Sequence, residues 1–152
     1  MKNLVIFASG SGSNAEKIIA HFQDSTQVQI SHIFCNNPEA GVIARAERLG
    51  VPCSIFSREE YKNGSVLRKI QSLQTDFIIL AGFLWLIPAE FVQAYPNRII
   101  NLHPALLPKF GGKGMYGYHV HEAVIAAKEP KSGITIHYVN EHYDEGEYIF
   151  QA

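Results

Sequence analysis

Residues 3–22 read NLVIFASGSGSNAEKIIAHF, which is an apolar run, a glycine-rich turn and a segment with helical periodicity. The run NLVIFAS is short and almost wholly apolar, as is typical of a strand buried on both faces. After the glycines, Ile18, Ile19 and Phe22 recur at the spacing of one helical face. A buried strand that enters a helix through glycines indicates an α/β protein.

The same alternation continues to the end of the chain. Strands are predicted at 28–35, 53–56, 76–82, 98–103, 133–139 and 148–152, and helices at 14–22, 40–49, 58–73, 88–95 and 117–128. This order predicts a Rossmann-like, doubly wound α/β fold, in which a mostly parallel sheet carries helices on both faces. Ligands of such sheets bind outside the carboxyl ends of the strands, so we expect the site there.

Length and composition restrict the class of protein. The chain has 152 residues and a net charge of −1, which indicate a single domain and give no sign of a nucleic-acid partner. No apolar stretch approaches the roughly 20 residues of a membrane helix, and the N-terminus lacks the layout of a signal peptide. Cys35 and Cys53 fit a reduced compartment, where buried thiols act as small apolar groups. We expect a cytoplasmic protein with small-molecule partners.

The glycine-rich turn SGSGSNA (9–15) follows the first strand. Glycines let the backbone approach a ligand, and the next helix offers free N–H groups and the positive end of its dipole, which suit a phosphate. Ser13 and Asn14 could add side-chain donors, or one of them could cap the helix.

A dinucleotide loop is the competing interpretation of this turn. Gly10, Gly12 and Ala15 match G-x-G-x-x-A, a pattern that also needs an acid at the end of the second strand for the ribose hydroxyls. The second strand ends in Cys35-Asn36-Asn37, with no acid in place. The phosphate of a mononucleotide-like ligand is favoured, while a dinucleotide and a tight turn without a ligand stay open.

A second polar signal lies at the end of a later strand, in NLHP (101–104). Strand alternation sends Asn101 and His103 to the same side, and Pro104 ends the ladder because it has no N–H to donate. An Asn N–H can stabilise an oxyanion on a carbonyl, and a His can move protons near neutral pH. The pair therefore suits attack of a nucleophile on a carbonyl. The alternative is a strand-end pair that bonds only to loop backbone.

Further polar residues complete the candidates. Asp144 in EHYDEGEY would favour the cationic, proton-donating form of His103 if the two met, but it could also be a plain turn residue. His137 alternates with Thr135 along a strand, and a structural role is favoured for it. His119 and His121, two residues apart, do not share a helix face. With no HExxH pattern and no Cys/His cluster, the sequence predicts no metal.

These segments together resemble the folate-dependent phosphoribosylglycinamide formyltransferase family. The turn SGSGSN is similar to its phosphate loop, and SREEY (57–61) to a segment with a folate-binding Arg. LAGFLWLIP (80–88), apolar and just after a strand, resembles the wall that holds the pterin. INLHPALLPKF (100–110) and DEGEYIFQ (144–151) resemble its catalytic strand and catalytic Asp loop.

The resemblance implies an enzyme of purine biosynthesis that transfers the formyl group of 10-formyltetrahydrofolate, its co-substrate, to the amine of 5'-phosphoribosylglycinamide. Asn101 would stabilise the oxyanion, His103 would donate the proton, and Asp144 would hold His103. The phosphate would be bound by Gly12, Ser13 and Asn14. Folate would be bound by Arg58, Leu84, Trp85, Leu86, Ile87, Asn101, Asn140, Glu141, His142 and Tyr143.

The sequence departs from the family in two places. The loop 110–121 is longer and richer in glycine than the usual form, as expected for a lid or for a tolerated insertion. Family members continue with a further strand and a C-terminal helix, so we expect residues 1–152 to be one formyltransferase domain that lacks them. Formyltetrahydrofolate hydrolase, another formyltransferase of the superfamily and a non-catalytic nucleotide-binding module are the alternatives.

Overall fold

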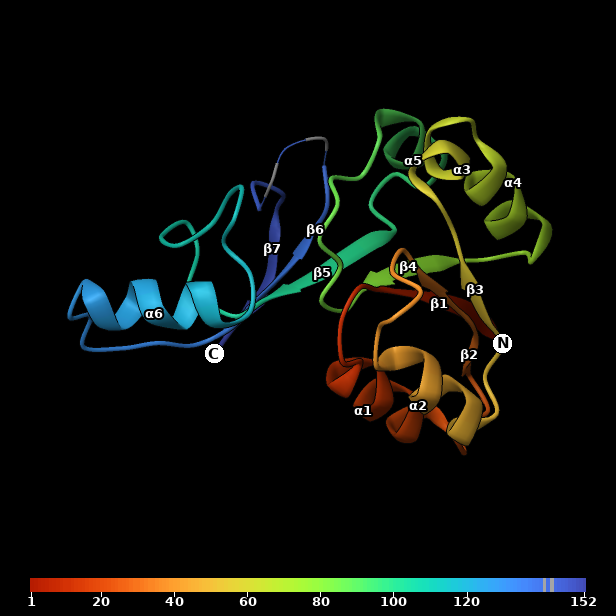
Figure 1. Ribbon diagram of the computed structural model, residues 1–152, viewed down its shortest axis with the longest axis horizontal. Helices are drawn as coiled ribbons and strands as arrows, with labels where there is room; N and C mark the ends of the chain where they lie inside the picture. The colour runs from red at the N-terminus through yellow and green to blue at the C-terminus, as the bar shows by residue number, and fades with distance from the viewer. Residues whose placement is uncertain (141, 143) are drawn as a thin grey trace. The chain divides into compact units, whose positions relative to one another are not determined.

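A computed structural model describes residues 1–140, 142 and 144–152 (Figure 1). The chain divides into two units, Met1–Phe83 and Leu84–Ala152. Within the described residues, no helix is long and apolar enough to cross a membrane.

The N-terminal unit is built on a parallel sheet. Its strands are β1 (Lys2–Ala8), β2 (Val28–Cys35), β3 (Cys53–Ile55) and β4 (Phe77–Leu80), in the order β3-β2-β1-β4. All three pairings are parallel. β1 lies between β2 and β4, and its residues from Val5 to Ala8 have no exposed surface. The wholly apolar run at the start of the chain is thus the central strand of this unit.

Four helices cover the two faces of this sheet. α1 (Ser13–Phe22) and α2 (Val42–Leu49) lie on one face, and α3 (Arg58–Lys62) and α4 (Ser65–Ser72) on the other (Figure 1). α2 ends at Gly50 in a left-handed conformation, at the stop that the sequence predicts. This unit confirms the doubly wound arrangement.

The single helix predicted over 58–73 is wrong, because the structure has two. Gly64 takes a φ of 88°, which a helix cannot continue, and the Asn63 side chain accepts a hydrogen bond of 2.9 Å from the Ser65 N–H. Asn and Gly are the residues that favour such a break. A capping box formed by Ser57 and Glu60 starts the first of the two helices.

The C-terminal unit contains α5 (Ala89–Ala94), β5 (Ile99–His103), α6 (Tyr118–Ala126), β6 (Thr135–Tyr138) and β7 (Tyr148–Gln151). β6 pairs antiparallel with both β5 and β7. The helix predicted between β5 and β6 had suggested parallel pairing of those two strands, whereas only a turn was predicted between β6 and β7. The register of β5 and β6 sets Asn101 opposite His137 and His103 opposite Thr135. The polar residues of β5 are therefore matched with polar residues of β6.

Candidate active site

Asn101, His103 and Asp144 meet in the C-terminal unit, a contact that the sequence left open for Asp144. Alternation along β5 turns Asn101 and His103 to one side, where Asn101 Nδ2 and His103 Nδ1 each lie 3.5 Å from Asp144 Oδ1. The His103 side chain is 4% exposed and that of Asp144 is 10% exposed. One oxygen of a nearly buried carboxylate thus faces both the amide and the imidazole.

His137 is the fourth member of this cluster. Its Nε2 lies 3.2 Å from Asn101 Nδ2 and 3.6 Å from Asp144 Oδ1. Its Nδ1 lies 2.9 Å from the Tyr138 carbonyl oxygen and donates to it, because a carbonyl only accepts. The sequence favoured a structural role for His137. Strand alternation was the available signal that His137 faces the site. The antiparallel register of β6 places His137 opposite Asn101, so its side chain does face the cluster.

Both ring nitrogens of His103 face acceptors. Nε2 donates to the Phe110 carbonyl over 2.7 Å, and Nδ1 faces the Asp144 carboxylate. A neutral imidazole has only one N–H, whereas the imidazolium has two. The two acceptors can therefore hold both N–H groups of an imidazolium, which is the form that donates a proton.

The loop after β5 helps to keep Asp144 ionised. Burial acts to raise the pKa of Asp144, but hydrogen bonds from His137 and from the Gly112 N–H, together with the nearby charge of His103, outweigh it. The pKa of Asp144 consequently lies below its ordinary value. The Gly112 N–H donates to Asp144 Oδ2 over 2.9 Å, and a Cβ on Gly111 would lie 3.2 Å from Asp144 Cβ. Sequence reasoning did not assign these two glycines to the site.

Thr135 anchors the segment that follows His103. Its hydroxyl donates to the Ala105 carbonyl over 2.7 Å and accepts from the Leu107 N–H over 3.0 Å. Gln151 Nε2 donates to the same hydroxyl and to the Leu107 carbonyl, at 2.9 and 3.0 Å. Thr135 is fully buried. These bonds fix the chain where it leaves β5, and the alternation of polar residues in β6 was the only signal for them.

The glycine loop lies in the N-terminal unit, between β1 and α1. The N-cap of α1 is Gly12, with a φ of 78°, so of the two roles that the sequence left open for Ser13 and Asn14, capping the helix is not the one they take. Both residues occupy the first turn and are exposed. Their side chains, with the first N–H groups of the ten-residue helix, are open to an anion.

The residues predicted to bind folate are spread along the chain. Arg58 opens α3 in the N-terminal unit, while Leu84–Ile87, Asn101, Asn140 and His142 belong to the C-terminal unit. The N–H of His142 donates to the Asn140 side chain over 2.9 Å, which shapes this turn. Glu141 and Tyr143 lie outside the described residues. Folate binding by this set stays a prediction.

The cysteines serve packing. Cys35 is fully buried in the core cluster of the N-terminal unit, and Cys53 packs against that cluster. Burial, with a smaller effect of Cys35, raises the pKa of the Cys53 thiol to about 11. Thiols of this kind are poor nucleophiles near neutral pH.

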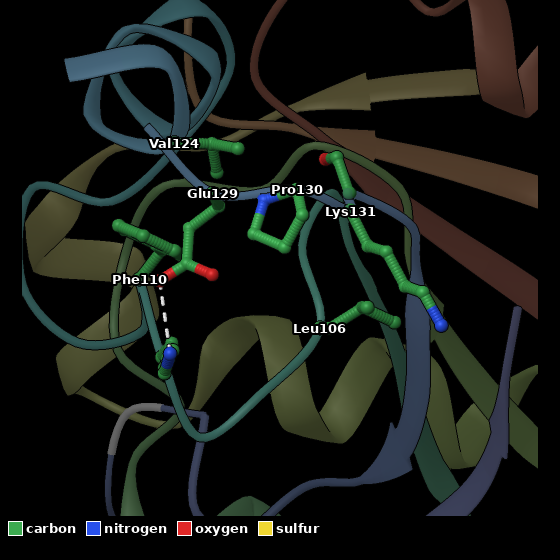
Figure 2. Close-up of a pocket in the computed structure, with 8 residues that line it drawn as sticks. Leu106, Phe110, Val124, Glu129, Pro130 and Lys131 are labelled. Atoms are coloured by element: carbon green, nitrogen blue, oxygen red, sulfur yellow. Dashed lines mark hydrogen bonds and ion pairs between the residues drawn. The ribbon is translucent and has the colours of Figure 1, made fainter. Parts of the chain in front are cut away.

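A pocket of about 220 Å³ lies in the C-terminal unit, beside the cluster of Asn101, His103, His137 and Asp144 (Figure 2). It is lined by Leu106, Lys109, Phe110, Val124, Glu129, Pro130, Lys131 and Ser132, and a 2.9 Å ion pair joins Lys109 to Glu129. Phe110 links it to the cluster, through the carbonyl that accepts from His103. None of the predicted site residues lines it. Within the described residues, no group of three His, Cys, Asp or Glu side chains is placed to hold a metal ion.

Comparison with known proteins gives the class to which this fold and cluster belong. The sequence model of the formyl transferase family matches residues 2–152, and the chain belongs to this family. It is 44% identical to the chloroplastic phosphoribosylglycinamide formyltransferase of Arabidopsis thaliana, over 99% of this chain and 54% of that protein. It is 36% identical to phosphoribosylglycinamide formyltransferase of Bacillus subtilis, over 99% of this chain and 78% of that protein.

Solved structures agree with the sequence relatives. Glycinamide ribonucleotide transformylase 1 from Geobacillus kaustophilus matches with a TM-score of 0.89 and 37% identity, over 100% of this chain and 81% of that one. The corresponding enzyme from Symbiobacterium toebii matches with a TM-score of 0.90 and 27% identity. These likenesses confirm the Rossmann-like α/β fold. The chain spans about half the length of the chloroplastic relatives from Arabidopsis thaliana and Vigna unguiculata.

Proposed function

We propose that this chain transfers the formyl group of 10-formyltetrahydrofolate to the amine of 5'-phosphoribosylglycinamide, a step of purine biosynthesis. The observation that carries the proposal is the meeting of Asn101, His103 and Asp144 at one carboxylate oxygen. A binding module has no need of an amide donor beside an imidazole that can carry a proton. The names of the relatives in Arabidopsis thaliana and Bacillus subtilis support the same reaction.

Asn101, His103 and Asp144 take part in successive steps of the transfer. The substrate amine attacks this carbon, and negative charge develops on its oxygen, where Asn101 Nδ2 can donate a hydrogen bond. His103 then gives a proton to the folate nitrogen as the bond between this nitrogen and the formyl carbon breaks, and the attacking amine gives up a proton to solvent, so that the tetrahedral intermediate collapses to the formylated amine. Asp144 keeps the imidazole oriented and balances its positive charge.

The remaining assignments belong to the same proposal. Gly12, Ser13 and Asn14 hold the ribonucleotide phosphate, and folate is bound by Arg58, Leu84–Ile87, Asn101 and 140–143. Residues 1–152 act as one formyltransferase domain whose partners are small molecules and whose compartment is the cytoplasm. Two of the relatives are named as chloroplastic proteins.

The experiment is formyl transfer from a 10-formyl folate to the ribonucleotide, followed by absorbance, with the wild-type chain, His103→Ala and the control His21→Ala. His21 is an exposed residue of α1, in the other unit. We expect turnover to fall about 10²–10⁴-fold in His103→Ala, the usual contribution of a general acid, and to be unchanged in the control. Ribonucleotide binding should survive in both variants.

Other outcomes would contradict this function. Formyl release without a ribonucleotide would point to a hydrolase, and ribonucleotide binding with no turnover would point to a binding module. Tight binding of a nicotinamide dinucleotide would support the interpretation of the glycine loop as a dinucleotide-binding loop.

A further inference from the structure

Helix α2 holds two neighbouring carbonyls of the glycine loop. The N–H of Val42, the first residue of α2, donates to the Gly10 carbonyl over 3.0 Å. One turn later, Arg45 Nε donates to the Ser11 carbonyl over 2.7 Å. The loop also packs tightly against α2 at Gly12, where an added Cβ would lie 2.5 Å from Val42 Cγ2. The loop is therefore positioned by α2 as well as by the helix that it starts.

These two contacts decide where the next N–H groups point. In a trans peptide, the carbonyl of one residue and the N–H of the following residue point in opposite directions. Because the carbonyls of Gly10 and Ser11 point to α2, the N–H groups of Ser11 and Gly12 point away from it. Successive N–H groups directed to one side form a concavity that binds anions. Holding the carbonyls thus prepares the donors for a phosphate.

Arg45 is itself held in place by Glu16. This carboxylate, in the first turn of α1, accepts hydrogen bonds from Arg45 Nη1 and, over 2.7 Å, from Arg48 Nη2. Pairs of this kind near the surface contribute about 0–1 kcal/mol to stability, so stability is a weak reason for the arrangement. The two arginines differ in one respect, since Arg45 also reaches the loop carbonyl of Ser11.

We propose that Arg45 is a positioning residue of the phosphate loop, which turns the Ser11–Gly12 peptide so that the Gly12 N–H faces the anion. The inference rests on the proposed function in one respect, since that function supplies the phosphate that the loop holds. Arg45 acts through the backbone and not on the reacting atoms. Its loss should change substrate affinity and leave the chemical step alone.

The test compares Arg45→Met with the matched control Arg48→Met, because each removes one cation from Glu16 and only the first frees the Ser11 carbonyl. We expect Arg45→Met to raise KM for the ribonucleotide about tenfold, the effect of one net hydrogen bond, with kcat and KM for the folate within about twofold of wild type. Arg48→Met should leave all three unchanged. Arg45→Lys, which keeps a donor and a charge, should recover part of the affinity.

A second measurement separates this inference from the proposed function. Titration with inorganic phosphate, followed by NMR at the Ser11 and Gly12 amides, requires no turnover. We expect weaker phosphate binding in Arg45→Met than in Arg48→Met, even if formyl transfer itself proves absent. Equal KM and equal phosphate binding in the two variants, or a wild-type loop that binds no phosphate, would overturn the role of Arg45.

Discussion

At the scale of the residue, Asp144 organises the cluster that it forms with Asn101, His103 and His137. Its Oδ1 faces Asn101, His103 and His137, and its Oδ2 accepts the Gly112 N–H. A buried carboxylate without such donors would be costly, and here every neighbouring group stabilises the negative charge. The ionised Asp144 should consequently be a source of stability for the unit as well as part of the proposed catalytic machinery.

We expect Asp144→Asn to lower the free energy of unfolding by about 1.5–3 kcal/mol near about pH 7, the order of one hydrogen bond to a charged group. The pKa of Asp144 is lower in the folded protein than its ordinary value. Its contribution is present above the unfolded pKa and is lost as the pH falls through the folded pKa. The difference in unfolding free energy between variant and wild type, measured by urea unfolding, should therefore narrow as the pH is lowered below the ordinary pKa of an aspartic acid. A difference that does not depend on pH would contradict this account.

At the scale of the element, the turn from β1 into α1 depends on one glycine. Gly12 is the N-cap of α1 and takes the left-handed conformation, while Val42 of α2 fills the space that its side chain would need. Gly10, two residues earlier, has no atom within 4 Å of a built Cβ. The two glycines of the motif thus have different structural duties.

Gly12→Ala should destabilise the protein by about 2–5 kcal/mol. An L-residue in the left-handed region costs about 1–2 kcal/mol, and the overlap with Val42 adds the cost of overpacking, about 1–3 kcal/mol. Gly10→Ala is the matched control and should stay within about 0.5 kcal/mol of wild type, the usual range of surface substitutions. Urea unfolding of both variants measures the contrast. Equal losses would mean that the turn tolerates a Cβ at position 12.

At the scale of the whole molecule, the features that were predicted correctly from the sequence are those that depend on local residue patterns. The apolar run of β1, the stop at Gly50 and the shared direction of Asn101 and His103 follow from strand and helix periods. The antiparallel direction of β6 against β5 depends on how segments more than 30 residues apart pair, which no local period records. For the same reason the sequence raised the contact of Asp144 with His103 only as a possibility and assigned His137 a structural role.

Stability should also be distributed unevenly along the chain. β1 is hydrogen-bonded to strands on both sides, and its central residues Ile6 and Phe7 have no exposed surface. β7 pairs with β6 within the described residues, and all four of its residues are exposed. Strands with few buried contacts open locally, whereas buried central strands exchange only when the protein unfolds.

Native-state hydrogen exchange, followed by NMR, tests this distribution. We expect the amides of Ile6 and Phe7 to exchange at least about 100-fold more slowly than those of 148–151, a difference of ~2.7 kcal/mol in opening free energy. Low concentrations of urea should speed exchange in β1 steeply, because its opening exposes the core, and exchange in β7 hardly at all. Equal protection of the two strands, with the same response to urea, would mean that β7 opens only when the whole chain unfolds.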